Sequence, residues 1–381
     1  MNYMEKALDI YEVVEAILSY GPGITTLVNG PMGNGKTQGI SGLLQDRLPS
    51  HDVVIINCAG MQDQGDLSMP ANLTELKEEK FVRFAPRAGL GFDSERPVIL
   101  ILDEIWKAPK SCHNVLGDVA NEHRMNEYNL PEGSYVIGLS NLEAEGLGDE
   151  IGAHLNDRVA ELYMKPLSVD DLLVYGAAHG WDTTMLTFIK ETPAVTDIFL
   201  EHADPESNPY IFHPQSTRKK FFSPRSAERA STVLKGRAAL VDRVGVASAN
   251  RIISAGVNGS VGEVAGEALM AMVRLGDDLV SFDQIKDDPS GAPVSSNPAA
   301  NYLLLFKALA AVDRSWVDQW MTYMYRLPAE VQMLFMMIAT RNEPKAGSSN
   351  DAIDKWRKRR DFISSAEGAG DWHMANKHLF A

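Results

Sequence analysis

The sequence is poor in cysteine and has no long apolar run. Cys58 and Cys112 are its only cysteines, too few for a disulfide scaffold or a four-cysteine zinc site, and this scarcity fits a reducing compartment. The purest apolar run is only Val98 to Leu102, whereas a bilayer-spanning helix needs about 20 such residues. Acidic residues interrupt the apolar pattern of residues 1–21, so we expect no signal peptide. The sequence therefore predicts a cytoplasmic protein without a membrane span.

Basic residues are also in short supply. The 36 Lys and Arg face 51 Asp and Glu, which gives a formal charge of −15. A uniformly acidic body repels phosphates, so a polybasic coat for nucleic acid is disfavoured. The net charge does not exclude a local basic channel. Hydrophobic residues at 45% and charged residues at 23% of the 381-residue chain are ordinary for a globular protein with a sizeable core. This length predicts two or three domains.

Apolar patterns in the first part of the chain alternate between strand and helix. After a helix at residues 3–20, we predict a parallel sheet with helices on both faces, because strands of this kind connect through helices. The predicted strands are 24–29, 52–57, 97–102 and 134–139. The predicted helices between and after them are 36–46, 110–127 and 150–158.

Helical periods dominate from residue 164 to the C-terminus. We expect a long loop at 203–224, linkers at 287–298 and 344–350, and two or three apolar helices within 300–339. The predicted divisions are an N-terminal helix (1–22), an αβ core (23–163), a helical region (164–290) and a C-terminal helical region with a tail (291–381). The tail begins with a basic segment, 355–360, for which a solvated helix face and an acidic or nucleic-acid partner both remain open.

A glycine-rich segment follows the first predicted strand and opens a helix. It fits the pattern G-x-x-x-x-G-K-[ST], whose glycines let backbone N–H groups point inward at a phosphate. The lysine of such a loop reaches the β and γ phosphates, and its hydroxyl residue can ligate Mg²⁺. The residues predicted to bind nucleotide are Gly30, Pro31, Met32, Gly33, Asn34, Gly35, Lys36, Thr37 and Gln38.

Two carboxylates, Asp103 and Glu104, follow the most apolar predicted strand. Asp103 at the strand tip suits a hold on Mg²⁺ together with Thr37, and Glu104 suits the general base that activates water. The chain has no N-K-x-D segment of the GTPase kind, so we expect ATP rather than GTP. The nine histidines show no ligand spacing, so we expect no metal other than Mg²⁺.

These motifs, followed by Leu139-Ser140-Asn141 at the end of the next strand, resemble the AAA+ ATPases. The resemblance implies a P-loop AAA+ core with a central parallel sheet, a helical lid and C-terminal helices. It also implies that Asn141 is the sensor residue that orients the lytic water. Further matches resemble the MoxR-like branch, namely Leu155-Asn156-Asp157-Arg158-Val159, Ser223-Pro224-Arg225-Ser226 and Val261-Gly262-Glu263.

The resemblance also implies roles for two arginines. Arg158 would be a finger that completes the site of the next subunit, which implies a ring, most often a hexamer. Arg225 would contact the γ-phosphate from the lid. Val159 departs from the usual Phe and removes a ring that would pack beside the finger. A simple ion pair of Arg158 with Asp157 or Glu161 is the alternative.

The resemblance also suggests what such a motor acts on. MoxR-like proteins usually act on a protein with a von Willebrand factor A-type domain, and we expect residues 60–95, inserted before the acidic strand, to contact such a partner. The alternatives are a DNA-acting AAA+ motor, such as a helicase or loader, and a non-hydrolysing switch. The insert balances its basic residues with acids, which disfavours DNA, and the complete set of Lys36, Glu104 and Asn141 disfavours the switch.

Overall fold

The protein is described by a computed structural model that covers residues 3–71, 82–145, 159–277, 279–340, 357–358 and 360–376. The chain forms two compact units, and the division between them falls between Leu167 and Ser168. Unit 1 thus ends four residues beyond the boundary expected at 163, and unit 2 contains the boundary expected at 290.

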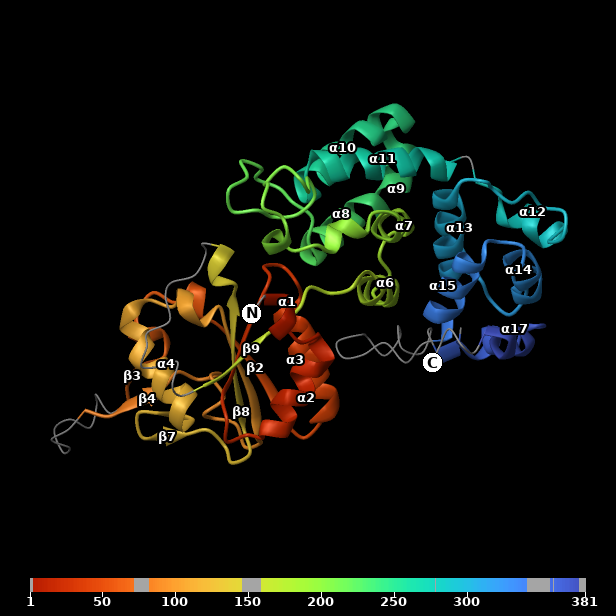
Figure 1. The fold of residues 1–381 in the computed structure, drawn as a ribbon. Coiled ribbons are helices and arrows are strands. Elements are labelled where there is room, and N and C mark those ends of the chain that lie inside the picture. The colour runs from red at the N-terminus through yellow and green to blue at the C-terminus, as the bar shows by residue number, and fades with distance from the viewer. Residues whose placement is uncertain are drawn as a thin grey trace. The chain divides into compact units, whose positions relative to one another are not determined.

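Unit 1 is built on a five-stranded sheet in which every neighbouring pair is parallel (Figure 1). The strand order is β2-β5-β8-β1-β9. Because the strands run in one direction, their carboxyl ends share one edge of the sheet, where open α/β sheets bind ligands. The strands are β1 Thr26–Gly30, β2 Asp52–Asn57, β5 Val98–Asp103, β8 Tyr135–Asn141 and β9 Ala160–Tyr163.

Val98 to Leu102 of the inner strand β5 are all apolar and buried because helices cover both faces of the sheet. Alternate side chains of a strand point to opposite faces. Leu100 and Leu102 pack on the face covered by α4 (Lys110–Glu122). Ile99 and Ile101 pack on the face covered by α2 and α3. Those two helices are Ile10–Tyr20 and Lys36–Arg47, and Figure 1 shows them across the sheet from α4. The predicted fold, a central parallel sheet with flanking helices followed by a helical region, is confirmed.

Two predicted helices of unit 1 have different bounds in the structure. The helix expected over 3–20 is divided into α1 (Tyr3–Lys6) and α2, because Leu8 pairs with Met164 as a parallel bridge. Asp9 then caps α2, accepting hydrogen bonds from two N–H groups of its first turn. The helix expected over 110–127 ends at Glu122, because His123 adopts a left-handed backbone with φ of 52°.

Five short strands of the described residues were not predicted, namely β9 and the four strands of two hairpins. β9 forms an edge of the sheet and is only partly buried. The two-stranded pairs β6–β7 (Arg124–Met125 and Tyr128–Asn129) and β3–β4 (Ser68–Pro70 and Phe84–Pro86) form separate antiparallel hairpins. The β3–β4 hairpin belongs to the inserted segment 60–95, and the helix expected at 150–158 lies outside the described residues.

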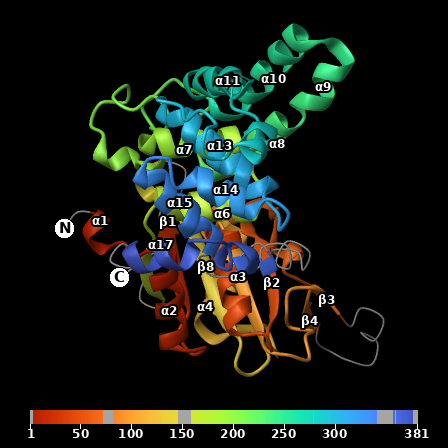
Figure 2. The same cartoon turned by 90° about the vertical axis from the view of Figure 1, so that its right-hand side faces the viewer.

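Unit 2 is helical in its described part. The expected loop at 203–224 is confirmed up to Ser223, which caps α8. The apolar segment 300–339 forms three helices, and Trp320 is fully buried there among aromatic rings. Helices α10 and α11 lie side by side (Figure 2). The helices are α6 Val169–Ala178, α7 Thr183–Glu191, α8 Pro224–Lys235, α9 Arg237–Val244, α10 Val246–Val261, α11 Glu263–Asp277, α12 Phe282–Asp287, α13 Pro298–Ala311, α14 Val317–Met324, α15 Ala329–Thr340 and α17 Ala369–Asn376.

In the part of the chain that the structure describes, no helix is both long enough and apolar enough to span a bilayer.

Candidate nucleotide site

The glycine-rich segment forms a loop between the end of β1 and the start of α3. Gly33 and Gly35 have φ of 73° and 74°, a left-handed backbone that residues with a Cβ rarely adopt. Lys36 is the first residue of α3, a helix of 12 residues, whose N-terminal end favours negative charge. The local structure is that of an anion-binding loop.

Lys36 is buried beneath this loop, with 7% of its surface exposed. Its Nζ donates to the carbonyl oxygens of Gly30 and Pro31 at 2.7 and 2.9 Å, and to Asn141 Oδ1 at 3.0 Å. These contacts place the ammonium group between the ends of β1 and β8. Lys36 therefore brings a positive charge to the edge of the sheet where the loop presents its N–H groups.

Thr37 and Asp103 form an oxygen-bearing pair next to Lys36. The Thr37 hydroxyl donates to Asp103 Oδ2 at 3.1 Å, joining the start of α3 to the end of β5. Mg²⁺ prefers oxygen ligands and is usually held by one or two protein groups together with substrate phosphates and waters. The pair fits that donor set. Within the described residues, no cluster of three or more His, Cys, Asp or Glu side chains offers a metal site of another kind.

Glu104 has an uncommon backbone conformation and two polar partners. Its φ is 52°, a region that costs a residue with a side chain free energy and that is frequent at functional sites. Its Oε1 pairs with Lys107 Nζ at 2.9 Å and accepts a long hydrogen bond of 3.4 Å from Asn141 Nδ2. These contacts fix the direction of the carboxylate at the end of β5.

The structure thus brings together five of the site residues predicted from the sequence, namely Lys36, Thr37, Asp103, Glu104 and Asn141. Gln38 is exposed on α3. Arg225 is exposed in the first turn of α8, in unit 2. Arg158 lies outside the described residues. The roles of these residues remain predictions.

Asn34 connects the loop to the end of unit 1. Its side chain, 5% exposed, donates from Nδ2 to the Lys165 carbonyl at 3.0 Å and accepts from the Leu167 N–H at 3.1 Å. The same segment is held from the other side by Leu8, whose carbonyl accepts from the Lys165 N–H at 2.8 Å. The last residues before unit 2 are therefore bonded directly to the glycine-rich loop.

Two residues of the site were not predicted from the sequence. Lys107 lies in a short 3₁₀ turn after β5 and pairs with Glu104. Glu145 lies in a second 3₁₀ turn after β8, and its Oε1 accepts from the Met32 N–H at 3.0 Å. Burial raises the pKa of the Glu145 carboxyl, while the Met32 N–H and the charges of Lys36 and Lys107 act in the opposite direction. The only sequence signal for Glu145 is an acid shortly after a strand that ends at the site.

The cysteines near the sheet are unsuited to nucleophilic chemistry. Cys58 and Cys112 are both fully buried in the apolar layer beneath α4. Burial, with a smaller contribution from the nearby Asp103, raises the pKa of the Cys58 thiol to about 12. Since the thiolate is the reactive form, the two thiols are packing residues.

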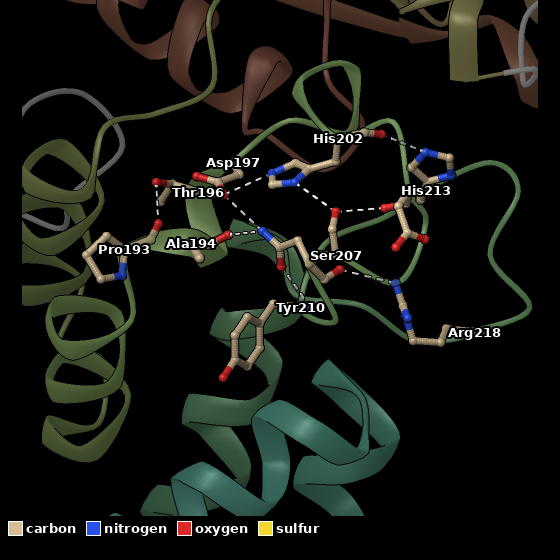
Figure 3. A network of polar contacts seen from close by, with 11 residues as sticks. Pro193, Ala194, Thr196, Asp197, His202, Ser207, Tyr210, His213 and Arg218 are labelled. Atoms are coloured by element: carbon tan, nitrogen blue, oxygen red, sulfur yellow. Dashed lines mark hydrogen bonds and ion pairs between the residues drawn. The ribbon is translucent and has the colours of Figure 1, made fainter.

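A polar network in the loop of unit 2 contains a Ser, a His and an Asp in contact (Figure 3). His202 Nε2 lies 3.1 Å from Asp197 Oδ2, and its Nδ1 lies 3.1 Å from Ser207 Oγ. The Ser207 hydroxyl donates to the Asp204 carbonyl at 2.7 Å, so its proton is not directed at the imidazole. Asn208 Nδ2 also donates to Asp197, at 3.0 Å. These contacts tie the loop to itself and indicate structural support rather than a nucleophilic triad.

Comparisons with known proteins show likeness at the level of three-dimensional structure only. A scan against protein-family models and a search of curated proteins found no match. Two variants of RuvB from Thermotoga maritima are 16% and 14% identical, with TM-scores of 0.35 and 0.38. The alignments cover 79% and 92% of this chain and 84% and 98% of theirs.

A third solved structure is NtrX from Brucella abortus in complex with ATP. It is 12% identical with a TM-score of 0.32, and the alignment covers 98% of this chain and 68% of NtrX. TM-scores this low assign no family.

Proposed function

We propose that this protein is an ATP-hydrolysing motor of the AAA+ type, of the MoxR-like branch, that remodels or matures a protein partner. One observation carries the hydrolase part of the proposal. Lys36 and Thr37, at the start of α3, meet Asp103, Glu104 and Asn141 at the carboxyl ends of β5 and β8. An anion-binding loop, a magnesium-type oxygen pair and a positioned carboxylate with an amide are the parts that phosphoryl transfer to water requires.

Each of these residues has a definite chemical task in the proposal. The loop N–H groups and Lys36 bind the phosphates. Glu104 accepts a proton from the attacking water, a contribution of about 10²–10⁴-fold to rate for a positioned general base. Asn141, within hydrogen-bond distance of both Lys36 and Glu104, orients that water against the terminal phosphate.

The Thr37 hydroxyl and the Asp103 carboxylate would hold Mg²⁺. When bound, the ion supplies positive charge that neutralises the charge developing on the phosphate oxygens. The hydrogen bond between the two side chains keeps both oxygens on the same side of the loop before any ion binds.

The proposal also includes assembly of subunits into a ring and coupling of unit 2 to the nucleotide. Both rest on the resemblance of sequence motifs. Arg158 would complete the site of a neighbouring subunit in a ring, most often a hexamer, and a finger of this kind is worth roughly 10³–10⁵ in rate. Arg225, exposed in the first turn of α8, would contact the γ-phosphate from unit 2.

The partner is proposed to be a protein, and the resemblance of sequence motifs suggests one with a von Willebrand factor A-type domain. The β3–β4 hairpin is the element of the core suited to contact it. Met69 on β3 is 56% exposed and Phe84 on β4 is 46% exposed, and Val82 beside them is 47% exposed. Exposed apolar side chains on one short hairpin favour a protein surface over a nucleic acid.

The test is a comparison of ATP binding and ATP hydrolysis by the wild-type protein and three variants. Glu104→Gln should retain ATP binding and lose turnover by about 10²–10⁴-fold, because the amide cannot accept the proton. Lys36→Ala should lose binding as well. Glu127→Gln, which makes the same charge change at an exposed residue in the β6–β7 turn, is the matched control and should behave as wild type.

Normal turnover by Glu104→Gln would remove Glu104 from its role. Normal binding and turnover by Lys36→Ala would remove the loop from the site and overturn the proposal.

A further inference from the structure

A carboxylate of this chain is bonded to the glycine-rich loop. Glu145 Oε1 accepts a hydrogen bond from the Met32 N–H at 3.0 Å, although the two residues are 113 positions apart in the sequence. Met32 lies within the loop between β1 and α3. Glu145 is 4% exposed, so its side chain is inside the site rather than at its rim.

In this contact the Glu145 carboxylate oxygen accepts from the loop in the way that a phosphate oxygen would. Loop N–H groups at the start of a helix select anionic oxygen acceptors, and a carboxylate is such an acceptor. The positive charges of Lys36 and Lys107 also act on Glu145. Lysine at this position of the loop reaches the β and γ phosphates of a nucleotide. Glu145 therefore occupies one N–H group of the proposed phosphate loop and lies within the electrostatic influence of the lysine that would serve the nucleotide.

The second oxygen of the carboxylate shows that the fit is incomplete. Glu145 Oε2 is buried and has no hydrogen-bond partner among the described residues. A buried acceptor without a partner costs free energy, and most buried side-chain polar atoms have a partner. The carboxylate is held through the Met32 N–H and, as a smaller contribution, the Leu142 N–H, while its Oε2 has no partner within the described part of the chain, so it can be exchanged for a ligand that bonds the loop more fully.

We propose that Glu145 is a built-in competitor for the nucleotide: its carboxylate occupies part of the phosphate position at Met32 and must leave when ATP binds. This inference rests on the proposed nucleotide site. It assigns to Glu145 control of ATP affinity, separate from the hydrolytic roles of Glu104 and Asn141.

The consequence for affinity follows from the fraction of molecules whose loop is open. The apparent Kd equals the intrinsic Kd divided by that fraction, so a carboxylate bonded to the loop about nine-tenths of the time weakens ATP binding about tenfold. Glu145→Gln keeps the length of the side chain and removes the charge. Glu145→Ala removes the acceptor as well. Both variants should bind ATP more tightly, by about tenfold, and Glu145→Ala at least as tightly as Glu145→Gln.

The experiment is calorimetric titration of the full chain with ATP and Mg²⁺. All proteins carry Glu104→Gln so that ATP is not consumed during the titration. The Kd of this parent is compared with those of the parent plus Glu145→Gln, plus Glu145→Ala, and plus Glu127→Gln. The last variant makes the same charge change at an exposed site and should leave the Kd unchanged, and thermal unfolding of each protein verifies that it is folded.

The outcomes separate this inference from the proposed function. A lower Kd for both Glu145 variants, but not for Glu127→Gln, supports it. An unchanged or higher Kd for the Glu145 variants, with normal ATP binding by the parent, overturns the inference and leaves the nucleotide site standing. Failure of every protein, the parent included, to bind ATP overturns the nucleotide site and the inference with it.

Discussion

Asn34 and Leu167 are joined by a hydrogen bond of 3.1 Å from the Leu167 N–H to Asn34 Oδ1. Asn34 lies in the middle of the glycine-rich loop, and Leu167 is the last residue of unit 1 before the chain enters unit 2. With the second bond from Asn34 Nδ2 to the Lys165 carbonyl, one buried side chain spans from the proposed phosphate site to the connecting segment. A shift of the loop on nucleotide binding would thus reach this segment through two hydrogen bonds.

Replacing Asn34 with Ala should loosen the connecting segment without removing the loop N–H groups. Loss of a buried hydrogen-bond partner costs about 1–2 kcal/mol, which corresponds to roughly 5–30-fold in a local opening equilibrium. Hydrogen–deuterium exchange of the Leu167 amide should accelerate by that factor. Asn129→Ala, at an exposed residue of β7, is the control, and equal exchange at Leu167 in the two variants would contradict the link.

Substitution of Thr37 tests whether Thr37 and Asp103 hold Mg²⁺. Thr37→Val replaces the hydroxyl with a methyl group of similar volume and removes the oxygen that lies 3.1 Å from Asp103, whereas Thr37→Ser retains it. The Mg²⁺ concentration that gives half-maximal ATP turnover should rise at least about tenfold in Thr37→Val, since one ligand is lost. It should stay near wild type in Thr37→Ser, and removal of Mg²⁺ by a chelator should stop turnover in both. Equal Mg²⁺ dependence of the two variants would exclude Thr37 as a ligand.

Much of the core of unit 1 follows from local sequence. Strand β5 is aliphatic because both of its faces are covered, and such a run is readable without the rest of the fold. The glycine-rich loop is equally local, since its φ angles require glycine at fixed spacing. Lys36 and Asp103 could therefore be assigned to one site before the sheet order was known.

The features that were not predicted from the sequence depend on contacts between distant residues, or on a residue that adopts a backbone conformation its type rarely has. Strand β9 is a half-exposed edge, and its Glu161 takes the Asn29 amide as a partner, so its pattern is not that of a buried strand. Helix α4 ends where His123, not Gly or Asn, adopts the left-handed backbone. Glu145 meets Met32 only through the tertiary fold. No spacing rule brings residues so far apart in sequence together.

The Glu145 carboxylate should also lower the stability of the protein without nucleotide, in a pH-dependent way. Burial raises its pKa in the folded protein above the ordinary value of 4.5, against the opposing Met32 N–H, Lys36 and Lys107, and Tyr3 also interacts with its charge. At pH values above the raised pKa, the folded protein keeps this group charged at a cost that the unfolded chain does not have. As the pH falls through the raised pKa, the carboxyl takes up a proton and the cost disappears.

Glu145→Gln should therefore have a higher Tm than wild type at neutral pH, and the difference should shrink as the pH approaches about 4.5. Thermal unfolding without nucleotide across this range provides the measurement. Glu127→Gln, at an exposed carboxylate, should show no such trend. A difference in Tm between Glu145→Gln and wild type that stays constant with pH would mean that the carboxylate is not held at a cost in the folded protein.

The β3–β4 hairpin provides the test of the proposed partner surface. Met69 and Phe84 are 56% and 46% exposed, and exposed substitutions of this kind usually change stability by no more than about 0.5 kcal/mol. The double variant Met69→Ser with Phe84→Ser should therefore hydrolyse ATP as wild type does, within about twofold. If the hairpin holds a partner, the same double change in the Glu104→Gln protein should reduce the protein retained in the presence of ATP several-fold, because central apolar contacts carry most of the binding free energy. Met374→Ser, at an exposed methionine of α17 (67% exposed), is the matched control, and quantitative mass spectrometry compares the retained proteins.

Equal retention by the hairpin variant and by Met374→Ser would show that the hairpin does not hold the partner. A fall in ATP turnover of the double variant would place the hairpin in the hydrolytic core instead.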